Sequence, residues 1–244
     1  MRNVRLDMCY EGTRYRGWQR LPGRDNTLQG KLEQTLSRIL QEPITVSASG
    51  RTDAGTHAMG QVVSFHCESD MPCQEILLQL RRYLPEDIGI YSCKNASPRF
   101  HARLNAKTKT YVYRLWNSDR PCVFERKFVH IDSRPLDVSA MEQAAAHFLG
   151  EHDFSAFCAN KNMKKSTIRY IERFKIAPVD GEIRFIVTGN GFLHHMVRIM
   201  VGTLLEVGRG ERTADSIPQL FAADRSEAGE LVPACGLCLM EVTY

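Results

Sequence analysis

Apolar and polar positions recur with clear periods along the first part of the chain. Val4, Leu6 and Met8 alternate with polar neighbours, which predicts a strand. Leucines then recur at helical spacing, and Asn26 followed by Gln29 resembles a capping box at the start of that helix. The whole pattern predicts a strand, a helix, two strands, a helix and a strand, over residues 3–10, 27–40, 44–49, 61–67, 74–83 and 88–93. This order is that of the split βαβ, or ferredoxin-like, unit.

The second part of the chain predicts a similar order of elements. Its strands are expected over residues 109–116, 168–176, 183–188 and 237–242, and its helices over residues 139–149 and 192–207. Ser139 is a plausible cap for the first of these helices. We therefore expect an α+β fold class, with two ferredoxin-like halves, antiparallel sheets and a catalytic cleft between the halves. The predicted domains are residues 1–105 and 106–244.

A short polar run between two predicted strands is the strongest candidate for chemistry. Residues 50–55 read Gly-Arg-Thr-Asp-Ala-Gly. Glycine lets the backbone approach a ligand closely, and the guanidinium of Arg51 could keep the carboxylate of Asp53 ionised. The run therefore predicts a reactive loop centred on Asp53.

The predicted helix over residues 192–207 contains an arginine in an otherwise apolar face. His194, Arg198 and Gly202 are spaced to share one stripe of that helix, and Gly202 would leave room for the arginine head group. Arg198 could be a snorkelling surface residue, or it could pair with a buried carboxylate, for which Asp53 is the candidate. Tyr111, on a predicted strand, could pack in the core or contact a substrate base.

Composition narrows the class of protein. The chain has 244 residues, 43% of them hydrophobic and 25% charged, with no apolar run long enough to cross a bilayer and no apolar signal region at its start. The eight cysteines are scattered, and Cys235 and Cys238 lack the further ligands of a zinc site, so we expect reduced thiols and a cytoplasmic location. No phosphate-cradling loop, dinucleotide fingerprint or His-Glu-x-x-His motif is present, so we expect no nucleotide cofactor and no metal.

The net charge of +4 is modest, but the basic residues are clustered. One cluster interleaves arginines with aromatic rings, which suits phosphates and unstacked bases. The clusters predict a nucleic-acid partner. They comprise Arg14, Arg16, Arg20 and Arg24 with Tyr15 and Trp18, then Lys161, Lys164 and Lys165, and finally Arg209 with Arg212.

The assembled motifs resemble the TruA family of tRNA pseudouridine synthases almost from end to end. Glu11 and Thr56 stand where many members have Asp and Val, and neither residue touches the proposed chemistry. The matching segments agree in order and in spacing. They are residues 10–19, 27–33, 50–63, 84–88, 100–103, 109–114, 150–154, 192–202 and 233–237.

This resemblance implies isomerisation of uridine to pseudouridine in the anticodon arm of tRNA, at positions 38, 39 or 40. It implies that Asp53 is the catalytic aspartate, that Tyr111 stacks on the substrate, that Arg198 pairs with the aspartate and that Arg51 is a second arginine of the site. It further implies a homodimer that works without a cofactor. We expect the remaining substrate contacts from Arg14, Arg16, Trp18, Arg20, Arg24 and His57.

Two other functions fit parts of the pattern. Ferredoxin-like sheets often bind RNA without catalysis, but no RNP1-like aromatic run is present and a pure binder has no need of the Asp53 loop. An acid protease that forms its aspartate pair by dimerisation is suggested by Asp-Ala-Gly at residues 53–55. That motif normally has Thr or Ser after the Asp, so the sequence favours the isomerase.

Overall fold

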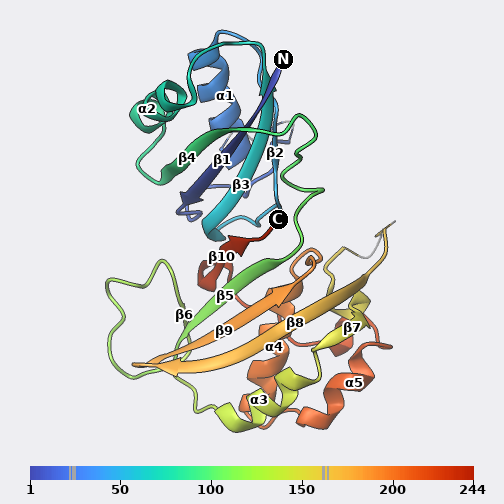
Figure 1. Cartoon of the computed structure of the whole chain (residues 1–244). Helices are drawn as coiled ribbons and strands as arrows, with labels where there is room; N and C mark the ends of the chain where they lie inside the picture. The colour runs from blue at the N-terminus through green and yellow to red at the C-terminus, as the bar shows by residue number, and fades with distance from the viewer. Residues whose placement is uncertain (22, 24–25, 161–162, 164) are drawn as a thin grey trace. The chain divides into compact units, whose positions relative to one another are not determined.

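The computed structural model describes residues 1–21, 23, 26–160, 163 and 165–244. The predictions for Arg24, Lys161 and Lys164 therefore lie outside the described residues. The chain divides into two compact units (Figure 1). Unit 1 comprises Met1–Lys107 together with Leu239–Tyr244, and unit 2 comprises Thr108–Cys238. The C-terminal residues thus belong to unit 1, whereas the predicted domains placed them in the second half.

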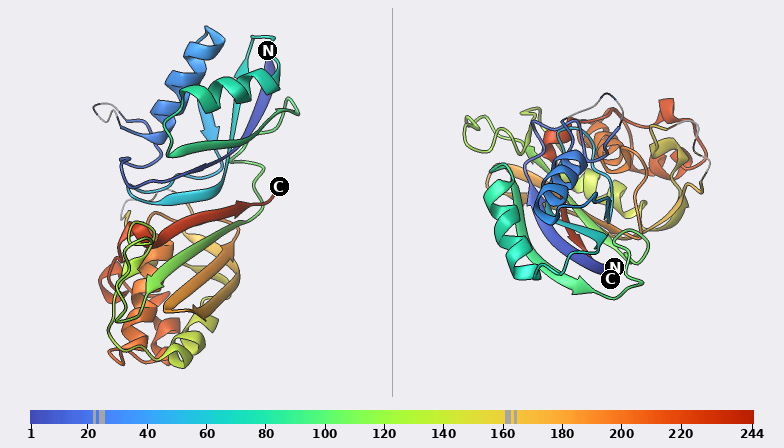
Figure 2. Two further views of the ribbon diagram at one scale, coloured as in Figure 1. Left: turned by 90° about the vertical axis from the view of Figure 1, so that its left-hand side faces the viewer. Right: turned by 90° about the horizontal axis from the view of Figure 1, so that it is seen from above.

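Unit 1 has the ferredoxin-like order of elements. Its sheet runs in the order β4-β1-β3-β2, and all neighbouring strands are antiparallel. Helices α1 and α2 pack against each other and lie on one face of this sheet (Figure 2). The elements are β1 (Arg2–Tyr10), α1 (Leu28–Leu40), β2 (Val46–Ala48), β3 (His57–Cys67), α2 (Cys73–Tyr83) and β4 (Ile88–Ala96).

The start of α1 shows why sequence patterns place elements better than they place caps. The leucines of this helix face the core as predicted, because Leu28, Leu32 and Leu36 are fully buried. The predicted capping box is wrong, since the N-cap is Thr27, whose hydroxyl accepts a hydrogen bond from the Gly30 amide. The side chain of Asn26 donates instead to the Arg14 carbonyl, at 2.6 Å.

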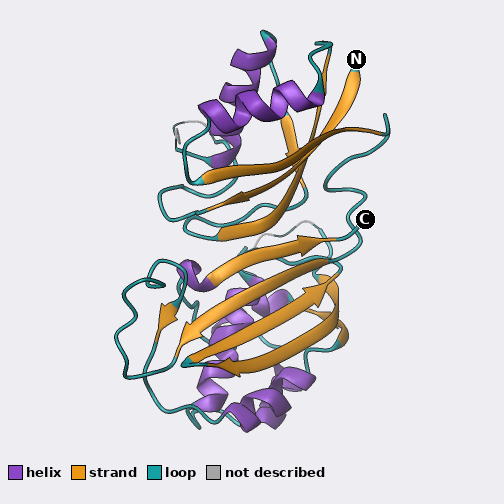
Figure 3. Cartoon of the chain, turned by 60° about the vertical axis from the view of Figure 1, so that its left-hand side comes forward, coloured by secondary structure: helices purple, strands orange, loops and turns teal. Residues whose placement is uncertain are grey.

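Unit 2 follows a related plan. Its sheet runs β5-β9-β8-β7 with antiparallel neighbours, and β6 pairs in parallel with β5. Helices α3 and α4 pack together on one side of this sheet (Figure 3). The elements are β5 (Lys109–Trp116), β6 (His130–Ile131), α3 (Val138–Ala146), β7 (Gly150–Asp153), β8 (Ile168–Val179), β9 (Glu182–Gly189), α4 (Met196–Gly208) and α5 (Ile217–Leu220). Strand β10 (Leu237–Val242) follows in the chain, and its residues from Leu239 onward belong to unit 1.

The two helices predicted for unit 2, α3 and α4, both begin elsewhere than expected. Helix α3 is capped by Asp137, whose carboxylate accepts from the Ala140 amide at 3.0 Å, so Ser139 is not the cap. Helix α4 begins at Met196 rather than at residue 192, because His195 takes a left-handed conformation with φ of 65°. His194 therefore precedes the helix and shares no helical stripe with Arg198.

Within the described part of the chain, no helix is long and apolar enough to cross a membrane. All eight cysteines are free thiols. Two of them, Cys67 and Cys158, are buried, and the others are half-buried. They are therefore less uniformly part of the core than the sequence suggested.

Candidate functional site

The loop that carries Asp53 joins β2 to β3 in unit 1. It ends in a tight turn in which the Thr56 amide donates to the Asp53 carbonyl at 3.1 Å. The neighbouring Thr52 is buried, and its hydroxyl lies 2.8 Å from the hydroxyl of Tyr10 on β1. Asp53 itself is half-buried. Hydrogen bonds therefore hold the loop at Thr52 and at Thr56, on either side of Asp53, while the Asp53 side chain stays accessible to solvent.

The arginine-rich loop that follows β1 forms the support of the Asp53 loop. A Cβ atom on Gly12 would collide with the carbonyl oxygen of Thr56, so only glycine allows this contact. Gly17 has a φ of 87°, and a Cβ atom there would lie 2.9 Å from the Thr52 carbonyl oxygen. Trp18 then donates its backbone N–H to that carbonyl at 3.0 Å. The two loops therefore form one hydrogen-bonded layer.

Two residues predicted to bind substrate are part of this support. Trp18 is 2% exposed, with its ring against Tyr10, so it offers no open face on which a base could stack. His57 is 4% exposed, and its Nδ1 atom accepts the Gly12 N–H at 3.0 Å. Both side chains therefore pack within the support of the Asp53 loop.

The predicted RNA-contacting arginines differ in their partners. Arg14 is bound through two nitrogens to the nearly buried carboxylate of Asp87, at 2.9 and 2.7 Å. Arg20 lies 3.2 Å from the buried Glu33. Among the described residues, the guanidinium of Arg16 has no carboxylate partner. Arg14 and Arg20 are therefore already paired with carboxylates of the protein itself.

A cavity of about 270 Å³ lies beside the Asp53 loop within unit 1. Arg51 lines it, and its expected role beside Asp53 stays a prediction. His101 and Arg103, from the loop after β4, line the same cavity. Residues 100–103 form one of the segments that match the family, and the sequence assigns no role to Arg103.

In unit 2, Tyr111 lies on the core-facing side of β5. Tyr111, Tyr113 and Leu115 are all buried, as their alternation predicted, and Arg114 points the other way. The ring of Tyr111 stands edge-on to that of Phe192, with ring centres 5.1 Å apart. This contact fixes the orientation of the tyrosine.

Arg198 lies in the first turn of α4, where its Nε atom donates to the Val232 carbonyl at 2.8 Å. Gly202, one turn later, packs directly on the backbone carbonyl of Glu230. The glycine therefore makes room for the segment that binds Arg198, and not for the arginine head group as the sequence suggested. The same segment accepts a hydrogen bond from the Tyr113 hydroxyl at the Pro233 carbonyl, 2.9 Å away.

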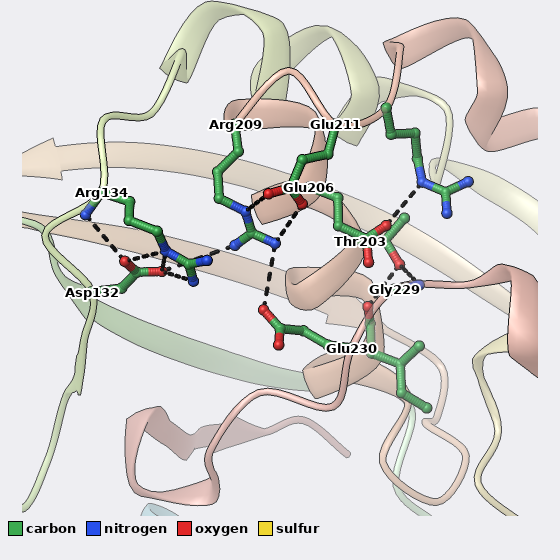
Figure 4. A network of polar contacts seen from close by, with 10 residues as sticks. Asp132, Arg134, Thr203, Glu206, Arg209, Glu211, Gly229 and Glu230 are labelled. Atoms are coloured by element: carbon green, nitrogen blue, oxygen red, sulfur yellow. Dashed lines mark hydrogen bonds and ion pairs between the residues drawn. The ribbon is translucent and has the colours of Figure 1, made fainter.

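Arg209 and Arg212 form ion pairs with carboxylates, and Figure 4 shows those of Arg209. Arg209 is bonded to Glu211 at 2.8 and 2.9 Å and reaches Glu230 at 3.5 Å. Arg212 donates to Glu206 at 3.0 Å. These two arginines are therefore parts of an internal network, and their predicted contact with nucleic acid stays a prediction.

Comparison with known proteins decides the family. The model of the tRNA pseudouridine synthase family matches residues 8–105 and 144–244. The chain belongs to the tRNA pseudouridine synthase family. It is therefore an enzyme that isomerises uridine to pseudouridine in tRNA. This confirms the resemblance found in the motifs, and neither a silent RNA-binding module nor an acid protease is consistent with it.

Individual relatives agree over the full length of both chains. The protein is 41% identical to "tRNA pseudouridine synthase A 2" of Bacillus cereus (strain ZK / E33L), with 100% of each chain covered. It is 44% identical, at the same coverage, to "tRNA pseudouridine synthase A 1" of Clostridium tetani (strain Massachusetts / E88). Among solved structures, the "Crystal Structure of a Cbf5-Nop10-Gar1 Complex" contains a chain 12% identical, with a TM-score of 0.36, covering 83% of this chain and 45% of that one. A likeness of that degree supports no further argument.

The sequence contained no signal for Arg103, in the loop after β4. His101 and Arg103 are far from Asp53 in the chain, and a lone arginine in a loop carries no local signal. The folded chain places both of them, together with Arg51, in the lining of one cavity. The one available hint was the position of residues 100–103 among the segments that resemble the family.

Proposed function

We propose that Asp53 is the catalytic carboxylate of this synthase, acting on uridines at positions 38, 39 or 40 of the tRNA anticodon arm. Family membership supports the reaction, and the match of residues 50–63 to the family motif supports the choice of residue. The observation that carries the proposal is the Asp53 loop itself. Glycines and the buried Thr52 hold its backbone, and the carboxylate is only half-buried.

The reaction conserves every atom of the substrate. The bond between N1 of the base and C1′ of the ribose breaks, the base turns, and C5 bonds to C1′. C5 then loses its proton while N1 gains one, so no oxidant, reductant or second substrate is consumed. A carboxylate can serve either by adding to the base or by assisting a glycal intermediate, and Asp53 suits both routes in its ionised form.

Three further residues complete the proposed site. Arg198 is the cation that keeps Asp53 ionised, since an ion pair at about 4 Å stabilises by up to about 4 kcal/mol at an effective dielectric of 20. Arg51 supplies a second positive charge next to the reacting nucleotide. Tyr111, oriented by Phe192, packs against the base and can accept the C5 proton through its hydroxyl.

We propose that the enzyme works as a cytoplasmic homodimer on a target base that has left its stack, at a cost of a few kcal/mol. The resemblance to the TruA family supports the dimer. Free thiols throughout the chain are consistent with a reducing compartment.

Replacing Asp53 by asparagine tests the proposal. The amide keeps the size of the side chain but removes the charge, so we expect pseudouridine formation to fall by at least about 1,000-fold while tRNA binding is retained. Release of tritium from tRNA carrying [5-³H]uridine measures turnover, and filter binding measures affinity.

Asp70→Asn is the matched control, because Asp70 is an exposed acid of the same unit outside the Asp53 loop. It should turn over tRNA at the wild-type rate. If Asp53→Asn also forms pseudouridine at that rate, Asp53 is not the catalytic group. If it loses tRNA binding together with activity, the residue has a binding role instead.

A further inference from the structure

The cavity beside the Asp53 loop has the character of an anion-binding site. Arg51, His101 and Arg103 all line it. Trp18 and Gln19 line it as well. With a volume of about 270 Å³, it is large enough for a phosphate group together with its waters.

The charges of this cavity are uncompensated. Throughout the described chain, neither Arg51 nor Arg103 has a carboxylate partner, and both side chains are exposed. Arg14 and Arg20 of the same unit are each paired with an acid. Two unpaired guanidinium groups that face one cavity repel each other, and their combined field attracts an anion.

His101 adds a hydrogen-bond donor to the two cations. Its Nδ1 atom accepts the backbone N–H groups of Arg103 and Leu104, at 3.1 and 3.3 Å. An acceptor at Nδ1 places the ring proton of the neutral imidazole on Nε2. The ring therefore offers an N–H donor from a residue that lines the cavity.

The loop that carries His101 and Arg103 is held rigidly from three sides. The Asn3 side chain donates to the carbonyls of Ser97 and Phe100, at 2.8 and 2.7 Å. The hydroxyl of Ser64 accepts the Ala102 N–H at 3.0 Å. The hydroxyl of the C-terminal Tyr244 donates to the Ala102 carbonyl at 2.8 Å. Such fixed geometry lowers the entropic cost of binding a ligand.

We propose that this cavity binds a backbone phosphate of the tRNA substrate, with Arg103 and Arg51 as charged ligands and His101 as a hydrogen-bond donor. The phosphodiester fits because it is the anion that an RNA substrate brings to every position along its strand. Arginine binds phosphate through two parallel N–H groups, which suits the walls of the cavity. The site would anchor the strand next to the Asp53 loop. This inference rests on the proposed function, since it presumes that the Asp53 loop meets the RNA.

The salt dependence of tRNA binding tests the site. Arg103→Ala should lower tRNA affinity about tenfold at moderate salt, as expected for one charge-assisted contact. The slope of log K against log salt concentration should become shallower by about 0.7 to 0.9, the value for one lost phosphate contact. The KM for tRNA should rise, and kcat at saturating tRNA should stay near the wild-type value.

Arg99→Ala is the matched control. Arg99 is exposed in the same loop but does not line the cavity, so its removal should leave the slope unchanged. Equal thermal unfolding midpoints for both variants would show that the loop has kept its fold. The proposal is overturned if Arg103→Ala has the wild-type slope, or if Arg99→Ala changes the slope by the same amount.

The experiments distinguish a failure of the phosphate site from a failure of the catalytic role of Asp53. A wild-type slope for Arg103→Ala together with an inactive Asp53→Asn would refute the phosphate site alone. A reduced slope together with an active Asp53→Asn would refute the catalytic role of Asp53 alone. Inorganic phosphate should compete with tRNA more weakly for Arg103→Ala than for the wild type, and equal competition would place the phosphate elsewhere.

Discussion

Two groups of arginines, one in each unit, have opposite environments. In unit 2, Arg209 is 9% exposed and is surrounded by the carboxylates of Asp132, Glu211 and Glu230. In unit 1, Arg51 and Arg103 are exposed, line one cavity and have no acidic partner within the described residues. The first arrangement satisfies its charges internally, whereas the second leaves them for a ligand.

This difference shows that clustering of arginines in a sequence does not identify a binding surface. A guanidinium attracts phosphate only if no carboxylate of the fold has already neutralised it. Arg209 and Arg212 are close in the sequence, yet their partners come from several segments of unit 2. Arg51 and Arg103 are distant in the sequence, yet they share one cavity.

Removing Arg209 should have the largest effect on stability. Arg209→Leu leaves buried Asp132 and half-exposed Glu230 without one of their cations, so we expect a loss of about 2 to 3 kcal/mol in the free energy of unfolding. Urea denaturation measures this loss. The salt slope of tRNA binding should not change, because Arg209 is not available to the RNA.

Arg99→Leu is the control for this substitution, since it removes an exposed arginine that has no carboxylate partner in the described chain. It should change the unfolding free energy by less than about 0.5 kcal/mol. If Arg209→Leu keeps wild-type stability but makes the salt slope shallower, unit 2 contains an RNA-binding cation and the comparison fails.

Replacing Asp132 should have a smaller effect that depends on pH. Hydrogen bonds from the Arg134 side chain lower the pKa of Asp132 below its ordinary value of 3.8. A lowered pKa stabilises the fold at pH values above that ordinary value, and the contribution disappears as pH falls through the folded-state pKa. Asp132→Asn should therefore cost about 1 kcal/mol at pH 7, a modest figure because Arg134 is largely exposed.

Unfolding curves of the wild type and Asp132→Asn at several pH values check this expectation. The difference between them should shrink as pH falls below 3.8 and should be constant between pH 6 and 8. A difference that grows on acidification would mean that the carboxylate is not held in its ionised form by Arg134.

The smallest effect is expected at Arg14, within the cluster that the sequence predicts to contact nucleic acid. Its guanidinium is bound to Asp87, so the pair has little net charge with which to attract an RNA phosphate. Arg14→Ala should leave the salt slope of tRNA binding at the wild-type value and change affinity by less than about twofold. If Arg14→Ala lowers the salt slope as much as Arg103→Ala does, then an arginine that is paired with a carboxylate can still bind RNA phosphate.

Local sequence patterns predicted most of the elements and missed their ends. The strand over residues 237–242 and the buried faces of β5 and α1 are confirmed, because their alternation reports directly which side chains avoid water. The caps at Thr27 and Asp137 and the late start of α4 were missed. Several polar residues near each end could serve as a cap, and small differences in backbone geometry decide between them.

Sequence by itself determined the family and the reaction and singled out the Asp53 loop, since a run of residues with glycines at set positions specifies a loop locally. Tertiary structure decided which cations have partners, that Trp18 and His57 support the loop, and that Gly202 receives the segment holding Arg198. The physical reason is the distance along the chain over which each effect acts. Periodicity and turn chemistry act over a few residues, whereas neutralisation of a charge depends on whichever carboxylate the folded chain brings to it.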